Sequence, residues 1–183
     1  MTTFETEPIV DFLVAHCTQA AFCAIRNASR IDMDDAEMAT IWWEEPVAAG
    51  AEAAWAALRE VGLAYRLFAP VLVDGTIDGD VRSVRFADGL TVDEKIVSVD
   101  ETRRRVAYTV LGTMFEHHSA SMQIAPVDEA SCRFIWISDF LPDAMAETVQ
   151  PLVEQGSRAL AKNIEAGLTR GGSDIPSDTG ARF

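Results

Sequence analysis

The feature that most constrains this chain is a long amphipathic stretch near its C-terminal end, from about Met145 to Leu168. Its apolar residues recur at steps of three and four, which places them on one face of an α-helix. They are Val149, Val153, Gly156, Leu160, Ile164 and Leu168. At ~1.5 Å per residue such a helix spans roughly 35 Å. A helix like this needs a broad apolar surface to lie on, and we expect the preceding residues to supply it.

The residues before the helix predict an antiparallel sheet, because short apolar runs are joined by short polar connections of the hairpin type. A first strand is predicted at 38–46, and two short helices follow between 51 and 70. Residues 71–76 lead into the sheet. The remaining strands are predicted at 80–86, 90–99, 104–111, 116–125 and 132–141. This order predicts an α+β domain in which a sheet packs on the long helix.

A second apolar stretch, at 8–27, predicts an extra N-terminal helix, and Pro8 suits its first turn. The Asp-rich residues after it are typical of a linker. We therefore expect three regions. They are an N-terminal helical extension at 1–36, the main domain at 37–168 and a flexible Gly- and Ser-containing tail at 169–183.

Composition excludes several classes of function. The formal net charge is −14 over 183 residues, so nucleic acid and anionic membrane surfaces would be repelled. The apolar run at 8–27 contains charged and polar residues, which argues against stable membrane insertion. Cys17, Cys23 and Cys132 have no metal-binding spacing and suit buried thiols of a cytoplasmic protein. We expect no metal, and no cofactor motif such as a phosphate-binding Gly-rich loop is present.

One hairpin register can be predicted from the residues. A three-residue loop at 87–89, with Gly89 at the position of positive φ, pairs Val84 with Val92 and Arg82 with Glu94. A two-residue loop would instead pair Val92 with Arg85, which mixes apolar and charged residues on one face. Two interpretations of the ion pair stay open. Either Arg82 and Glu94 orient a polar ligand inside a cavity, or they form a partly solvated pair worth under about 1 kcal/mol.

The following strands each carry alternating residues on one face. These are Val106, Tyr108 and Val110, then His118, Ala120, Met122 and Ile124, then Phe134, Trp136, Ser138 and Phe140. On a concave face they would line an apolar pocket with polar tips at Tyr108, His118 and Ser138. Alternation alone favours the simpler interpretation, in which these residues fill a core under the helix.

Two further residues are candidates for special roles. His117 and His118 point to opposite faces of a strand, so they cannot bind one metal ion together. His118 alone is a candidate general acid or base, because histidine titrates near neutrality. Gly156 lies midway along the apolar helix face, and its missing side chain leaves room either for a ligand or for close approach of the sheet.

The first and last strands carry apolar residues on both faces. We assign Ile41, Trp43, Ile135 and Ile137 to the outer face of the sheet. An antiparallel sheet covered by a helix on one side usually has a polar outer face. These residues therefore predict a cover, either the 8–27 helix or a second copy in a homodimer.

The order of elements resembles the helix-grip fold of the START and major-birch-pollen-allergen superfamily. More closely, it resembles the bacterial polyketide cyclase/dehydrase and lipid-transport family of the SRPBCC superfamily. The resemblance covers about 38–168 and is carried by many short segments. They are Glu44–Val47, Ala53–Leu58, Tyr65–Pro70, Asp80–Val84, Thr91–Asp100, Tyr108, Ile124–Pro126 and Phe134–Pro142.

The resemblance implies a curved antiparallel sheet of six to seven strands wrapped round the C-terminal helix, with an elongated cavity between them. It implies that the cavity holds a hydrophobic or amphipathic small molecule such as a polyketide, lipid, isoprenoid or aromatic compound. The predicted ligand-binding residues are Arg82, Glu94, Tyr108, His118, Met122, Trp136, Phe140, Gly156 and Leu160. The family often has an aromatic residue such as Tyr at the position of His118.

Three functional hypotheses follow. The first is a binding module for such a ligand. The second is a polyketide cyclase or dehydratase in which His118 or Glu94 moves protons. The third is a protein-interaction module that acts through the outer face of the sheet. The residues do not decide whether the protein is an enzyme.

Overall fold

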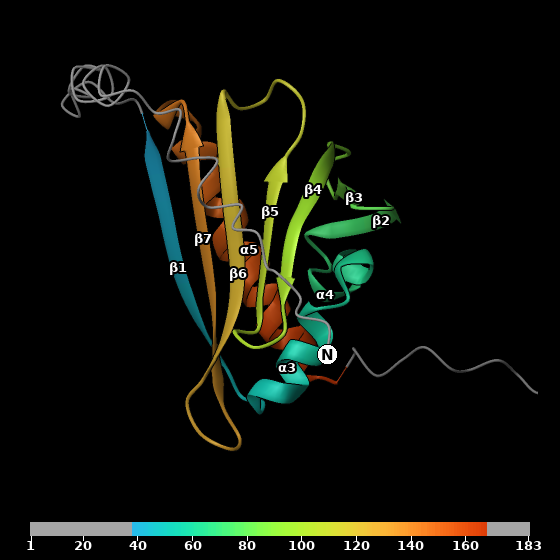
Figure 1. Cartoon of the computed structure of the whole chain (residues 1–183), viewed down its shortest axis with the longest axis vertical. Helices are drawn as coiled ribbons and strands as arrows, with labels where there is room; N and C mark the ends of the chain where they lie inside the picture. Colours follow the sequence, from blue (N-terminus) through green and yellow to red (C-terminus); the bar gives the residue numbers. More distant parts are fainter. Residues whose placement is uncertain (1–37, 168–183) are drawn as a thin grey trace, which may run out of the picture. The chain divides into compact units, whose positions relative to one another are not determined.

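The computed structural model describes residues 38–167. The predicted N-terminal helix at 8–27, the extension at 1–36 and the tail at 169–183 lie outside these residues, so they stay predictions. Within the described part, the chain forms the predicted α+β helix-grip fold, a seven-stranded antiparallel sheet with one long C-terminal helix (Figure 1). None of the helices in this part is long and apolar enough to cross a membrane.

The elements follow the predicted order. The chain begins with β1 (Ala39–Val47), followed by α3 (Ala51–Leu58), the short 3-10 helix η2 (Val61–Leu63) and α4 (Ala64–Leu67). The strands that follow are β2 (Leu72–Asp78), β3 (Val81–Phe86), β4 (Thr91–Asp100), β5 (Arg105–Val110), β6 (His117–Pro126) and β7 (Cys132–Leu141). The short helix η3 (Asp143–Met145) leads into α5 (Ala146–Glu165), which has 20 residues.

The sheet has the strand order β1-β7-β6-β5-β4-β3-β2, so the first strand closes one edge beside the last. All other neighbours are consecutive hairpins. The β3–β4 register confirms the prediction, because Arg82 lies opposite Glu94 and Val84 opposite Val92. Gly89 in the connecting loop has φ +94°, a conformation that side chains disfavour.

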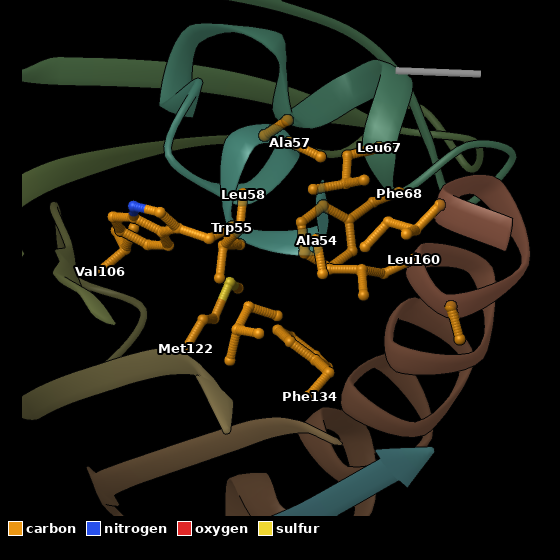
Figure 2. Packing of buried hydrophobic residues seen from close by; sticks show 14 of the residues in the cluster. Ala54, Trp55, Ala57, Leu58, Leu67, Phe68, Val106, Met122, Phe134 and Leu160 are labelled. Carbon is orange, nitrogen blue, oxygen red and sulfur yellow. The ribbon is translucent and has the colours of Figure 1, made fainter. Parts of the chain in front are cut away.

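The core lies between the inner face of the sheet, the pair of helices α3 and α4, and the second half of α5. Figure 2 shows residues from all three meeting there, among them Trp55, Phe68, Phe134 and Leu160. Phe134 and Leu160 have no exposed surface. Three hydrogen bonds fix the layer of short helices. The Trp55 indole N–H donates to Glu101 over 2.7 Å, and the Asn163 amide donates to the carbonyls of Leu67, at the end of α4, and of Ala69.

The assignment of Ile41 and Trp43 to the outer face is wrong. Ile41 lies opposite Ser138, and Trp43 lies opposite Trp136. Because directly opposed residues share a face, both point to the inner side, where Ile41 is buried against the first half of α5. The helix covers β1, which the strand pattern alone does not indicate.

The outer face has a different apolar group. Trp42 lies opposite Ile137 on this face and is 59% exposed. Ile135 is the next residue of β7 on the same face and lies opposite Glu44. Ile135 and Ile137 are half-buried, and their pairing with Glu44 and Trp42 places them on the outer face. A homodimer through the outer face stays a prediction, but its residues are Trp42, Ile135 and Ile137.

Candidate functional site

A cavity of about 210 Å³ lies between the inner face of the sheet, α4 and the first half of α5. Its walls are mostly apolar side chains. Seven of the nine predicted ligand-binding residues line it: Arg82, Glu94, Tyr108, His118, Met122, Trp136 and Gly156. Ser138, predicted as a polar tip, lines it too. The concave face is therefore partly a cavity wall and partly filled core.

The other two predicted residues lie in packed regions. Phe140 belongs to a cluster with Ile41 and Val153, and Leu160 belongs to the main core under α3 and α4. Neither has exposed surface, and neither is among the residues that line the cavity. Alternation and helix periodicity gave both residues the correct face but could not place them along the length of the cavity.

The Arg82–Glu94 pair forms a buried ion pair at one end of the cavity. The Arg82 Nε donates to Glu94 Oε2 over 2.8 Å, and Nη2 lies 2.6 Å from the same oxygen. Nη1 donates to the Val61 carbonyl over 3.3 Å, and the guanidinium lies 5.4 Å from the centre of the Tyr108 ring. Arg82 is therefore well satisfied, and the interpretation as a partly solvated pair is excluded by burial of both side chains.

Glu94 has one oxygen left over. Both Arg82 contacts go to Oε2, and no described residue donates to Oε1. Burial raises the pKa of Glu94 above its usual range, and the charge of Arg82 opposes this shift only in part. Among residues 38–167, only Trp136 Nε1 is a fully buried side-chain nitrogen or oxygen without a hydrogen-bond partner. Glu94 Oε1 also lacks a partner, so it is not fully buried and retains accessible surface.

Tyr108 lies beside Arg82, and Trp136 lies beside Tyr108. Burial raises the pKa of Tyr108 far above its usual value, and the Glu94 charge raises it further, so the hydroxyl keeps its proton at any physiological pH. The Trp136 indole N–H lies near enough to this hydroxyl to lower the Tyr108 pKa, although it makes no hydrogen bond to a described residue. This end of the cavity therefore combines a free carboxylate oxygen with protonated, uncharged groups.

His118 has a fixed tautomer. The Val110 backbone N–H donates to its Nδ1 over 3.1 Å, so this nitrogen is the acceptor and the ring proton lies on Nε2. The Nε2 proton points to Ser138 Oγ, 3.3 Å away. Burial, and then the nearby His117, lowers the His118 pKa to about 4. At neutral pH His118 is therefore an uncharged hydrogen-bond donor, an arrangement less suited to accepting a proton than to orienting Ser138.

Several cavity residues escaped sequence reasoning. The cavity is also lined by Phe68, which follows α4, by Phe115 from the β5–β6 connection, and by Val149 and Leu152 from α5. Leu90 and Met114 also line it and are 42% and 39% exposed, so they mark its mouth. Of the first four residues only Val149 had a usable signal, because it lies on the predicted apolar face of the helix. Loop residues carry no periodicity that would place them.

Gly156 permits a close approach. A Cβ added there would lie 3.0 Å from Trp136 Cζ3 and 3.5 Å from Phe68 Cδ1. The sequence left two roles for Gly156, room for a ligand or close approach of the sheet. The short distance to Trp136 supports close approach of the sheet to the helix. Residues 38–167 contain no group of three or more His, Cys, Asp or Glu side chains that could hold a metal ion.

Fold and cavity together define a helix-grip protein with an internal cavity between the sheet and α5. Residues 38–168 match the family described as polyketide cyclase / dehydrase and lipid transport, and the chain belongs to this family. Membership gives it a ligand-binding or polyketide-cyclase-type role in this fold. No curated protein matches the chain in sequence.

Solved structures share the fold at low sequence identity. The Zhui aromatase/cyclase from Streptomyces sp. R1128 is 21% identical, with a TM-score of 0.59, covering 74% of this chain and 99% of that one. Norcoclaurine synthase from Thalictrum flavum, in complex with dopamine and hydroxybenzaldehyde, is 21% identical, with a TM-score of 0.57, covering 74% and 89%. XoxI from Bacillus cereus is 18% identical, with a TM-score of 0.61, covering 69% and 95%.

Proposed function

We propose that the protein binds a compact hydrophobic or amphipathic small molecule in the cavity between the sheet and α5. The observation that carries the proposal is the cavity itself, about 210 Å³ with apolar walls and polar groups gathered at few points. Protein interiors rarely keep voids much larger than a water molecule, because lost packing contacts cost stability. A void of this size inside a packed domain is therefore expected to serve a ligand.

The size of the cavity limits the ligand. A cavity of ~150 Å³ is large enough to bind benzene, so 210 Å³ suits a molecule of one or two rings or a short isoprenoid. A long acyl or poly-β-ketone chain would have to extend through the mouth at Leu90 and Met114. Arg82 and Glu94 are proposed to orient the polar end of the ligand, with Tyr108, His118 and Trp136 beside it.

Native mass spectrometry of the full chain purified from its own host tests this function. We expect a co-purifying small molecule that is absent from a cavity-filling variant, Leu152→Trp, since Leu152 lines the cavity from α5. Gln155→Trp is the matched control, because Gln155 is exposed on the same helix. If the wild type carries no ligand and an apolar dye binds all three proteins equally, the cavity is not a binding site.

A second candidate function, a cyclase or dehydratase, is favoured by one specific observation. Glu94 Oε1 is unpartnered, borders the cavity and belongs to a carboxyl group whose pKa is raised, which are properties of a general base. In this function Glu94 would take a proton from the bound ligand, and Tyr108 would donate a hydrogen bond to the charge that develops.

Glu94→Gln separates carrier from enzyme, with Asp93→Asn as the control on the exposed side of the same strand. If the protein is an enzyme, Glu94→Gln is expected to retain binding of the co-purified ligand, and the rate of turnover should fall by roughly 10²-fold or more. A carrier shows no turnover in either protein. Because the substitution leaves Arg82 without its charge partner, circular dichroism must first show that the variant is folded.

A further inference from the structure

The cavity carries hydrogen-bonding groups of opposite polarity at two separate places, and this restricts the ligand further than size does. The inference rests on the proposed binding function. Glu94 lies on β4 and Ser138 on β7, three strand spacings apart in the sheet. At roughly 4.8 Å per spacing the two strands are separated by about 14 Å measured along the sheet, while both side chains line the same cavity.

The first place accepts hydrogen bonds. Glu94 Oε1 has no partner among the described residues, whereas Oε2 takes both contacts from Arg82. A carboxylate oxygen that borders an apolar cavity is poorly solvated, so a ligand group that donates to it is favoured. A ligand that brings a second negative charge is disfavoured, because Arg82 is already neutralised by Glu94 and its remaining nitrogen binds the Val61 carbonyl.

The second place donates hydrogen bonds, and the backbone sets this polarity. Val110 N–H occupies Nδ1 of His118, which puts the ring proton on Nε2 and directs it at Ser138 Oγ. The Ser138 oxygen then accepts from the histidine, and its own proton is left to point elsewhere. Ser138 is 2% exposed and the cavity is the open space beside it, so a ligand oxygen there would receive that proton. His118 acts through Ser138 and is a positioning residue.

We propose that the cavity selects an uncharged ring compound that donates a hydrogen bond to Glu94 from one end and accepts one from Ser138 at the other, as a hydroxyl-bearing aromatic ketone does. Compounds with only a donor or only an acceptor leave one buried group unpaired. Carboxylates are rejected because they place a charge beside Glu94. Ser138 and His118 thereby become determinants of specificity for the acceptor end of the ligand.

Four probes with the same two fused rings test the proposal by isothermal titration of the full chain. They are 6-hydroxy-2-acetonaphthone, 2-acetonaphthone, 2-naphthol and naphthalene. We expect the hydroxy ketone to bind tightest, and each single-function probe to bind roughly five- to tenfold more weakly, since each lacks one buried hydrogen bond. Naphthalene should bind weakest of the four.

Ser138→Ala assigns the acceptor end. It should weaken the two ketones about fivefold and leave 2-naphthol and naphthalene unchanged, a split that a purely structural role would not produce. Ser119→Ala is the matched control, because Ser119 is exposed on β6 and does not line the cavity. It should leave all four affinities unchanged.

The outcomes separate failure of the inference from failure of the proposed function. If naphthalene binds as tightly as the hydroxy ketone, the cavity is a binding site without the proposed polarity, and the inference is overturned. An equal loss for all probes in Ser138→Ala also overturns it. If none of the probes binds, the proposed function fails for compact ring ligands, and the inference fails with it.

Discussion

The two halves of α5 share one apolar face, but they meet different surroundings. The second half, with Leu160, Ala161 and Ile164, is packed in the main core under α3 and α4. The first half lines the cavity through Thr148, Val149, Leu152, Val153 and Gly156. Helix α3 packs in the main core, and none of its residues lines the cavity. The same amphipathic pattern therefore produces a filled core at one end and a cavity wall at the other.

Backbone and polar contacts reinforce this difference. In the second half, the Asn163 amide donates to the carbonyls of Leu67 and Ala69 over 2.9 and 2.8 Å, which ties the helix to the end of α4. In the first half, Pro151 has no N–H to donate to the carbonyl of Glu147. The second half is therefore fastened to α4 by a side chain, whereas the first half lacks one helical hydrogen bond, on its exposed side at Pro151.

The same substitution in the two halves should have the largest and most unequal effect. Leu160→Ala is expected to lower the free energy of unfolding by about 3 kcal/mol, because Leu160 is fully buried. Leu152→Ala should cost under about 1 kcal/mol, because Leu152 is half-buried and already borders the cavity. Urea unfolding of the full chain measures both, and equal losses would remove the distinction between the halves.

Asn163→Ala should be the next largest effect. The substitution removes the donor from two backbone carbonyls in a buried place, and we expect a loss of about 2 kcal/mol of unfolding free energy. Gln150→Ala is the control in the first half, where an exposed amide donates to Glu154. It should cost less than about 0.5 kcal/mol. A comparable loss in the two variants would mean that Asn163 does not fasten the second half.

The sequence predicted the fold and the polar end of the cavity well, because both depend on local rules. The three-residue loop with Gly89 fixed which residues oppose each other, and that register brought Arg82 to Glu94. Periodicity also gave the correct inner face for Tyr108, His118 and Trp136. These predictions required only the period of a strand and the geometry of one turn.

Depth along the cavity could not be predicted. Phe140 and Leu160 have the same periodicity as true lining residues, but neighbours from β1 and α3 fill the space beside them. Ile41 and Trp43 were placed on the wrong face, because the pairing of β1 with β7 joins distant parts of the chain. The tautomer of His118 depends on one backbone N–H from β5, for which the sequence has no signal.

The free energy of unfolding should depend on pH through His118, one of the polar groups that line the cavity. The His118 pKa is about 4 in the folded protein and about 6.5 in an unfolded chain. As the pH falls from 6.5 towards 4, only the unfolded state takes up this proton, so stability is lost. Discounted for partial exposure of the ring, the loss attributable to His118 is about 1–2 kcal/mol.

His118→Gln should flatten the decline of the unfolding free energy between pH 7 and pH 4.5 by that amount. His117→Gln is the comparison variant. His117 is the exposed neighbour on the same strand and the smaller cause of the lowered His118 pKa, so its removal should flatten the decline less than His118→Gln does. Urea unfolding at four or five pH values gives the slope for each protein. If the two variants decline equally steeply, the buried ring of His118 does not contribute to the acid sensitivity of this end of the molecule.

The smallest effect on stability is expected at Gly156, where the two halves of α5 meet. Gly156→Ala gains about 1 kcal/mol of helix propensity. Its new Cβ would lie 3.0 Å from Trp136 Cζ3, so the indole must move by a few tenths of an ångström, and the space available to it is the cavity. These effects oppose each other, and the unfolding free energy should change by less than about 0.5 kcal/mol.

Ligand binding should respond more than stability does. A displaced Trp136 reduces the cavity, so 6-hydroxy-2-acetonaphthone should bind Gly156→Ala about threefold more weakly, or worse. Gln155→Ala, on the exposed side of the same turn, gains helix propensity without contacting Trp136 and should leave binding unchanged. Stable protein with weakened binding in Gly156→Ala alone would show that the cavity begins at this residue. Unchanged binding would mean that Gly156 serves packing only and that the cavity wall begins nearer the start of α5.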